Sequence, residues 1–166
     1  MSVDERLLAD IRANIGSTHQ ADLGEITALH IQRYALAIGE EDPLYTDREH
    51  ARSLGYADVV APPNMLPSVV EWGVGAPEPE LNVDGTTGEH LHGVDTSGVR
   101  TMGGGETMTF HEPVVAGARV TQTTTLTDAT MRHGNSGAMI IVSYRNQYHD
   151  QHGTELMTCD RTMLLR

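Results

Sequence analysis

Apolar positions in the first third of the chain recur with the period of an α-helix. One set follows the capping box Ser2-x-x-Glu5 and comprises Leu7, Leu8, Ile11 and Ile15. A second set begins near Thr27, ends at Gly39 and comprises Ile31, Tyr34, Ala35 and Ile38. Each set gathers its apolar side chains on one face, so the spacing predicts two helices that pack against a core.

Two shorter helices are predicted on either side of a proline pair. The capping box Thr46-x-x-Glu49 begins a helix that ends at Gly55, and residues 56–61 have the composition of a short strand. Pro62-Pro63 ends that strand, and a stripe of apolar residues follows: Met65, Leu66, Val69 and Val70. Pro67 falls in the first turn of this helix, where proline is tolerated. Because the helix is apolar nearly all round, we expect it to be buried on most sides.

The last third of the chain has the composition of β-strands. Residues 106–111, 118–128, 138–149 and 154–165 are rich in Thr, Val and Ile, and turn residues separate them. Residues 73–105 are rich in Gly, Pro, Asp and Thr with little periodicity, which predicts a long loop. Helices followed by strands indicate an α+β fold: a single domain, residues 1–166, with an antiparallel sheet wrapped around the central apolar helix.

Composition excludes several classes of protein. The 166 residues carry a formal charge of −12, and all eleven basic residues are arginine, without a cluster that could neutralise phosphates. This argues against nucleic-acid binding. No stretch approaches the roughly 20 apolar residues of a membrane span, and the N-terminus lacks a signal-peptide pattern. A lone cysteine, Cys159, cannot form an internal disulfide. We therefore expect a cytoplasmic protein.

Several sequence blocks resemble the MaoC-like hydratase/dehydratase family. The most specific block is Ile38-Gly39-Glu40-Glu41-Asp42-Pro43-Leu44-Tyr45-Thr46-Asp47, and others are Ala61-Pro62-Pro63-Asn64-Met65-Leu66 and Gly104-Gly105-Glu106-Thr107-Met108-Thr109-Phe110-His111-Glu112-Pro113-Val114. The similarity is strongest to the branch related to the dehydratase domain of fungal-type fatty acid synthase. It implies a hotdog fold, a dimer with active sites at the subunit interface, and hydration of trans-2-enoyl thioesters or the reverse reaction, without a metal or another cofactor.

The resemblance also implies where the chemistry takes place. Hydration needs a group that activates water and returns a proton, and donors aimed at the thioester oxygen. The family supplies an Asp/His pair in a Gly-Asp-x-Asn-Pro-Leu-His block, whose corresponding positions here are Glu40, Asp42 and Tyr45. Glutamate can act as a base, whereas tyrosine, with a reference pKa near ~10, is a better donor. The backbone N–H of Asn64 is the candidate oxyanion donor. The alternative for residues 40–45 is an acidic cap and turn before a helix.

Further candidates lie outside these blocks. His90 and His92, in the long loop, are candidate replacement acid/base groups, although a solvated loop is the simpler interpretation and no third metal ligand is evident. The resemblance suggests Pro63, Met65, Gly104 and Gly105 as substrate-binding residues. The alternative for the glycines is close backbone approach in a strand. Arg100 is a candidate contact for a CoA phosphate.

The distribution of charge bears on the substrate carrier. Residues 1–95 hold 17 acidic side chains and 5 arginines, whereas residues 96–166 hold 6 of each. The neutral half contains Arg100, Arg119, Arg132 and Arg145, of which one would meet a CoA phosphate. An acyl carrier protein is itself acidic and would be repelled by the acidic half, so CoA is favoured.

Three functional hypotheses remain open at this stage. The first is a hydro-lyase acting on acyl thioesters, as a homodimer or with a partner. The second is a non-catalytic acyl-binding subunit of a heteromeric dehydratase, because the Asp/His pair is replaced by Glu40 and Tyr45. The third is diverged chemistry on the same fold, such as thioester hydrolysis, elimination or cyclisation.

Overall fold

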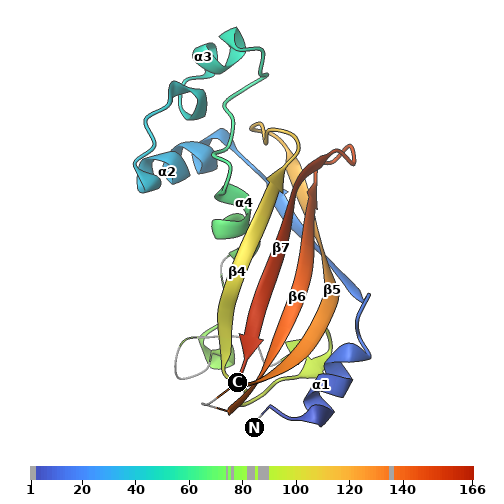
Figure 1. Cartoon of the computed structure of the whole chain (residues 1–166). Helices are drawn as coiled ribbons and strands as arrows, with labels where there is room; N and C mark the ends of the chain where they lie inside the picture. Colours follow the sequence, from blue (N-terminus) through green and yellow to red (C-terminus); the bar gives the residue numbers. More distant parts are fainter. Residues whose placement is uncertain (1–2, 74, 76, 82–84, 86–89, 135–136) are drawn as a thin grey trace.

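A five-stranded antiparallel sheet forms the body of the protein (Figure 1). The computed structural model describes residues 3–73, 75, 77–81, 85, 90–134 and 137–166. Strand order is β1-β5-β6-β7-β4. The strands are β1 (Thr18–Glu25), β4 (Thr101–Phe110), β5 (Arg119–Gly134), β6 (Gly137–His149) and β7 (Glu155–Leu165). A separate two-stranded ribbon pairs β2 (His90–Leu91) with β3 (Val94–Asp95). The predicted α+β hotdog architecture is confirmed.

The helices lie at both ends of the sheet and along one face of it (Figure 1). They are α1 (Glu5–Arg12), α2 (Ala28–Ile38), α3 (Arg48–Ser53) and α4 (Met65–Ser68), with 3₁₀ turns η1 (Pro43–Tyr45), η2 (Val70–Trp72) and η3 (Glu78–Glu80). Helix α2 has the predicted ends, because the Thr27 hydroxyl caps its first turn and Gly39 adopts a left-handed conformation at its end. No helix within the described residues is long and apolar enough to cross a membrane.

Two apolar clusters make up the core. The first surrounds α4 and includes Ile31, Met65, Leu66, Tyr148 and Met157. The second lies under α1 and includes Leu7, Leu8, Ile11, Leu126 and Ile140. Met65 and Leu66 of α4 are buried as expected, whereas Val69 of the predicted stripe is 47% exposed. Helix α4 spans only four residues before the chain continues as η2. This helical segment is therefore short, so it covers only part of the sheet face on which it packs.

The structure corrects several local predictions. Strand β1 was not predicted, because its sequence THQADLGE is polar and it lies at the edge of the sheet. Residues 56–61 form no strand and contribute a single bridge between Val60 and Val115. Asp4 and Asp47 cap α1 and α3 in place of the predicted Ser2 and Thr46. Ser2 itself lies outside the described residues.

Candidate functional site

A cavity of about 320 Å³ lies at the helical end of the sheet, between η1, the start of α4 and the ends of β4 and β7. We call it the helical-end cavity. Its lining residues are Leu44, Tyr45, Tyr56, Val60, Ala61, Pro62, Pro63, Leu66, Phe110, His111, Glu112, Pro113, Val114, Leu156 and Met157. Most of these side chains are apolar, and the polar groups are two tyrosines, one histidine and one glutamate. Such a lining suits an apolar ligand that makes a few polar contacts.

The acidic loop before η1 uses its carboxylates to hold its own backbone. Glu40 Oε1 accepts hydrogen bonds from the backbone N–H groups of Glu41 at 3.0 Å and Asp42 at 3.2 Å. Asp42 Oδ1 accepts from the N–H of Leu44 at 2.8 Å and so caps η1. Both side chains are exposed, and neither lines the helical-end cavity. These hydrogen bonds are the ones expected if residues 40–45 form an acidic cap and turn before a helix.

Tyr45 is the residue of this loop that reaches the cavity. It is half-buried, and burial raises the pKa of its hydroxyl, with a further contribution from the carboxylates of Glu40 and Asp42. The hydroxyl therefore keeps its proton at neutral pH. In that state Tyr45 can donate a hydrogen bond to a thioester oxygen, but it cannot serve as the base that activates water.

The residues at the start of α4 have different surroundings. Asn64 is exposed, and its side chain makes no capping hydrogen bond. Its carbonyl oxygen accepts from the hydroxyl of Ser68 at 2.6 Å, and that hydroxyl lies 2.9 Å from the phenolic oxygen of Tyr34. Met65 is buried in the core around α4, whereas Pro63 is exposed and lines the cavity. Pro63 and Tyr45 thus line the same cavity. Asn64 is the residue that follows Pro63 in the sequence.

His111 and Glu112 also line the cavity, although sequence reasoning gave neither a role in the site. The imidazole Nε2 of His111 lies 3.0 Å from the hydroxyl of Thr158 and 3.9 Å from Glu155 Oε1. Both contacts come from β7, the neighbouring strand. The signal that could have found them is their position at the end of a predicted strand, directly before Pro113.

Other candidate residues lie away from the helical-end cavity. The ribbon that contains His90 and His92 lies near α1 and the chain termini, at the opposite end of the sheet (Figure 1). Arg100 is exposed, and its backbone pairs with Arg166 at the same end. The structure therefore does not bring these three residues together with Tyr45. In the described part of the chain, no three metal-ligating side chains form a group.

The presence of glycines in β4 has a structural explanation. The pairing of β4 with β7 shifts between Gly103 and Gly105, and Gly105 has a φ of 131°. A Cβ atom on Gly104 would lie 3.0 Å from Thr162 Cγ2 and 3.1 Å from its carbonyl oxygen. The close approach of the β7 backbone at Thr162 is therefore sufficient to account for a glycine at position 104, without a role in substrate binding.

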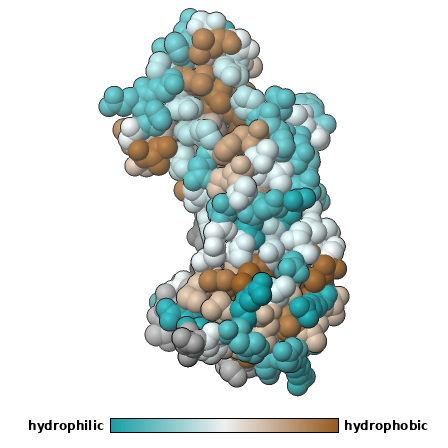
Figure 2. Space-filling model, in the orientation of Figure 1, coloured by the Kyte–Doolittle hydropathy of each residue, from teal (hydrophilic) through white to brown (hydrophobic). Residues whose placement is uncertain are grey.

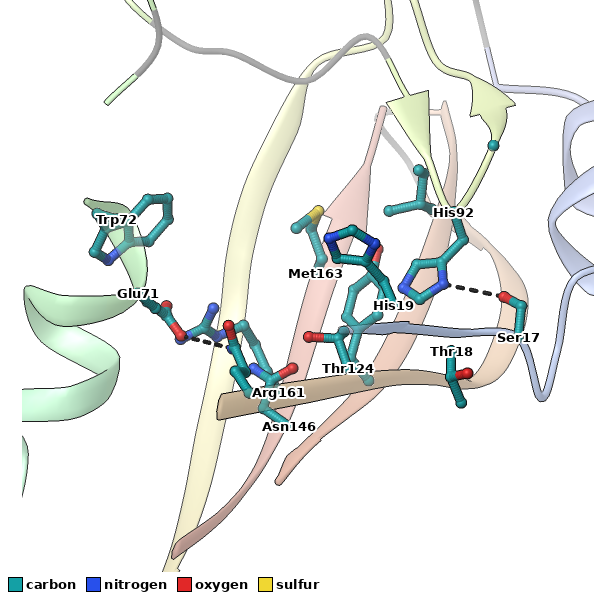
Figure 3. Close-up of a pocket in the computed structure, with 14 residues that line it drawn as sticks. Ser17, Thr18, His19, Glu71, Trp72, His92, Thr124, Asn146, Arg161 and Met163 are labelled. Atoms are coloured by element: carbon teal, nitrogen blue, oxygen red, sulfur yellow. Dashed lines mark hydrogen bonds and ion pairs between the residues drawn. The ribbon is translucent and has the colours of Figure 1, made fainter. Parts of the chain in front are cut away.

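A second cavity, of about 600 Å³, lies on the sheet face that also carries α4. We call it the sheet cavity, and Figure 3 shows its lining. The lining residues are Ser17, Thr18, His19, Glu71, Trp72, Leu91, His92, Gly93, Gln122, Thr124, Tyr144, Asn146, Arg161 and Met163. Unlike the helical-end cavity, it is lined largely by polar side chains. It contains one of the predicted histidines, His92.

Glu71 at the end of the helical segment is the centre of a hydrogen-bonded cluster beside the sheet cavity. Its Oε2 accepts from the Tyr148 hydroxyl at 2.7 Å and from Gln122 Nε2 at 3.2 Å. Its Oε1 lies 2.7 Å from Arg161 Nη2, an ion pair drawn in Figure 3. Arg161 also pairs with Glu106 on β4. These contacts fix the end of η2 against β5, β6 and β7.

His92 occupies a constrained position in the turn of the ribbon. Its φ is 48°, an uncommon value for a residue with a side chain. Its Nδ1 lies 3.0 Å from the hydroxyl of Ser17, and its ring stacks on Tyr144 with 5.6 Å between centroids. Burial lowers the pKa of His92, so the imidazole is neutral at pH 7.

Comparison with known proteins places these features in a family. Residues 13–159 match a family described as the FAS1-like dehydratase domain region. A UPF0336 protein of Streptomyces avermitilis is 30% identical over 144 residues, which cover 86% of this chain and 85% of that protein. The family match over residues 13–159 takes in the acidic loop, α4 and most of the sheet.

Solved structures have the same fold. A chain of the ChsH1-ChsH2 complex from Mycobacterium tuberculosis gives a TM-score of 0.69 at 19% identity, covering 96% of this chain and 89% of that one. A chain of the HadBC (3R-hydroxyacyl-ACP dehydratase) complex from the same organism gives 0.62 at 18% identity, covering 91% and 96%. These identities support the fold alone. Together with the match over residues 13–159, they show that this chain is a hotdog protein of the FAS1-like dehydratase family.

Proposed function

We propose that this protein takes part in the reversible hydration of trans-2-enoyl thioesters, as the acyl-binding subunit of a hotdog assembly. The helical-end cavity holds the acyl thioester, and the Tyr45 hydroxyl donates a hydrogen bond to the ligand. A second hotdog subunit supplies the Asp/His pair that takes a proton from water and returns one to the substrate. The family, which is described by its dehydratase domain, supports the reaction class.

One observation carries the proposal: the side chains at the family's catalytic positions are not arranged as an acid/base pair. Glu40 and Asp42 accept hydrogen bonds from their own loop and do not line the cavity. Tyr45 lines the cavity, but burial and the two carboxylates keep it protonated. A chain with a mainly apolar cavity, a Tyr45 hydroxyl donor and no acid/base pair at the family's catalytic positions is equipped to bind the thioester rather than to activate water.

Two further features support a heteromeric assembly. Both solved structures compared above are described as complexes of two different proteins. In addition, the helical end of this chain exposes Leu29, Leu36 and Ile38 of α2, and Figure 2 shows apolar atoms over that end of the molecule. An exposed apolar surface of this kind suits contact with a second subunit.

The test is co-expression with a hotdog protein that contains the Gly-Asp-x-Asn-Pro-Leu-His block, beginning with one encoded by a neighbouring reading frame. Turnover of crotonyl-CoA and longer enoyl-CoA thioesters is followed by the loss of enoyl absorbance. We expect the pair to act much faster than the sum of the separate proteins. A pair that does not co-purify, or a rate equal to that sum, would contradict the proposal.

A second candidate function is hydration by this chain alone. It is favoured by Tyr45, whose protonated hydroxyl lines the cavity and could act as the acid. Activity of the isolated chain that is lost in Tyr45→Phe, and retained in a control such as Arg33→Gln on the exposed surface of α2, would support it.

For the carrier, we propose CoA. The charge surplus lies in the half of the chain that contains the helical-end loops, and it would repel an acidic carrier protein. Arg119 and Arg145 are engaged with Asp22 and Asp160. Arg100 and Arg132 are exposed. Comparison of CoA and carrier-protein thioesters in the same binding assay tests this part, and tighter binding of the carrier-protein form would overturn it.

A further inference from the structure

The sheet cavity forms a polar layer between the two apolar clusters of the core. It is lined by inward-facing side chains of three strands: Gln122 and Thr124 on β5, Tyr144 and Asn146 on β6, and Arg161 and Met163 on β7. Glu71 and Trp72 close it at the end of η2, and His92 closes it on the ribbon (Figure 3). Its volume of about 600 Å³ lies in the range of sites for small ligands.

Among the described residues that line this cavity, two buried polar atoms have neither a hydrogen-bond partner nor an ion-pair partner. They are the Tyr144 hydroxyl oxygen and Asn146 Oδ1. Tyr144 is 5% exposed and Asn146 is 3% exposed, and both side chains line the cavity. Leaving such a group without a partner costs about 1–3 kcal/mol. A folded protein that keeps two of them in one cavity is arranged to receive partners from a ligand.

The charges around the cavity define the ligand further. The Glu71 carboxylate and the Arg161 guanidinium form an ion pair at 2.7 Å, so their charges offset each other. The His92 imidazole is neutral at pH 7, because burial lowers its pKa. The lining has balanced charge, a hydroxyl donor and a carbonyl acceptor that are both unpaired. It therefore suits an uncharged group that can both donate and accept a hydrogen bond. A hydroxyl group has these properties.

The cavity is also placed to meet an acyl chain. Leu66 in α4 lines the helical-end cavity, and Glu71 in η2 lines the sheet cavity, so the same short helical segment lies between the two sites. Leu91, Trp72 and Met163 supply apolar contacts among the polar groups. A saturated alkyl chain in this cavity would leave the Tyr144 hydroxyl and Asn146 Oδ1 unpaired, whereas a hydroxyl group on the chain could pair with both.

We propose that the sheet cavity is a specificity subsite for an uncharged hydroxyl group on the acyl chain, so that this protein prefers hydroxylated acyl thioesters to plain fatty acyl thioesters. The inference rests on the proposed function, because it assumes that the ligand is an acyl thioester. It adds the substrate class, which the helical-end cavity alone does not specify.

The first test measures binding by the full-length wild-type protein. The probes are decanoyl-CoA and a series of hydroxydecanoyl-CoA thioesters, in which the hydroxyl group is placed on successive carbons from the middle of the chain to its end. Isothermal titration calorimetry gives each dissociation constant. We expect at least one hydroxylated member to bind about tenfold more tightly than decanoyl-CoA. Equal or weaker binding of every hydroxylated member would overturn the inference while leaving the proposed function intact. Failure of every thioester to bind would overturn both.

The second test uses variants that remove the unpaired atoms and keep the side-chain shape: Tyr144→Phe and Asn146→Leu. Each should weaken binding of the preferred hydroxylated thioester about fivefold to tenfold and leave decanoyl-CoA binding unchanged. Ser143→Ala, on the same strand with its side chain outside the cavity, is the control and should change neither.

Thermal unfolding without ligand separates this role from a structural one. Because the Tyr144 hydroxyl and Asn146 Oδ1 have no partner in the described structure, the variants should be as stable as the wild type or more stable. A clear loss of stability in both variants, together with an unchanged preference for the hydroxylated thioester, would show that these groups serve the fold and would refute the inference.

Discussion

The ion pair between Glu71 and Arg161 gives the sharpest prediction about stability. The Glu71 side chain is 5% exposed and that of Arg161 is 19% exposed, so both charges are largely removed from water. Replacing Arg161 by Met keeps an unbranched apolar stem but removes the guanidinium, which leaves the Glu71 carboxylate buried without its counter-charge. Two neutral donors, Tyr148 and Gln122, remain beside it.

The expected magnitude follows from this burial. Removing one partner of a buried pair typically destabilises a protein by about 3–5 kcal/mol. We expect about 3 kcal/mol for Arg161→Met, at the lower end, because Arg161 keeps some solvent contact and Glu71 keeps two donors. For a chain of this size, this corresponds to a fall in Tm of roughly 10 °C. Adding Glu71→Gln removes the stranded charge, so the double variant should recover about half of the loss.

Urea denaturation followed by circular dichroism measures these differences. Arg145→Met is the matched control, because Arg145 forms an ion pair with Asp160 at 2.8 Å on the outer face, where its side chain is 52% exposed. An exposed pair contributes less than about 1 kcal/mol. If Arg161→Met costs no more than Arg145→Met, or if the double variant is less stable than Arg161→Met alone, the assigned role of the buried pair is wrong.

Three further predictions concern the loops and the core. Asp47→Ala removes the acceptor for the Glu49 and His50 N–H groups and should lower the free energy of unfolding by about 1 kcal/mol, measured by urea denaturation; no change would contradict the cap. Glu40→Gln keeps an acceptor for the turn, so the steady-state rate of the assembled enzyme should change by less than about threefold, whereas a hundredfold loss would identify Glu40 as the base. Burial raises the pKa of the Cys159 thiol from 9.0 to about 11. The folded state therefore keeps a proton that the unfolded chain loses, so the free energy of unfolding falls as pH rises. Between pH 8 and 9.5 the wild type should lose about 1 kcal/mol more of its free energy of unfolding than Cys159→Ala does. Parallel pH profiles of the two proteins would refute this.

The sequence predicted those elements whose signals are local. Helix α2 has a hydroxyl cap at Thr27, a helical stripe and a glycine that permits a left-handed end, and all three are visible in the sequence. Strands β5, β6 and β7 are long, and Thr in β5, Ile and Val in β6, and Leu, Met and Thr in β7 are separated by turn residues, so their positions followed from composition. Strand β1 carries no such signal, because an edge strand is selected by pairing with β5 rather than by its own apolar pattern.

The candidate sites depend on contacts that sequence reasoning cannot place. The family block pointed to Glu40 and Tyr45, but only the folded loop shows that the carboxylate of Glu40 holds the turn. Glu71 and Arg161 are 90 positions apart and meet only because the helical segment packs on β7. One signal was available: Asn146 alternates with buried Tyr144 and Tyr148 along β6, which puts a polar group on an inward face.

The most direct test of the central claim is the rate at which the isolated chain hydrates a trans-2-enoyl-CoA that it binds. The protein is purified without any other hotdog subunit, binding is established by calorimetry, and enoyl absorbance is then followed at saturating substrate. We predict saturable binding and no turnover above the uncatalysed rate, because Tyr45 stays protonated and Glu40 and Asp42, at the family's other catalytic positions, do not line the cavity. Rapid turnover by the isolated wild type that is abolished in Tyr45→Phe would contradict the account.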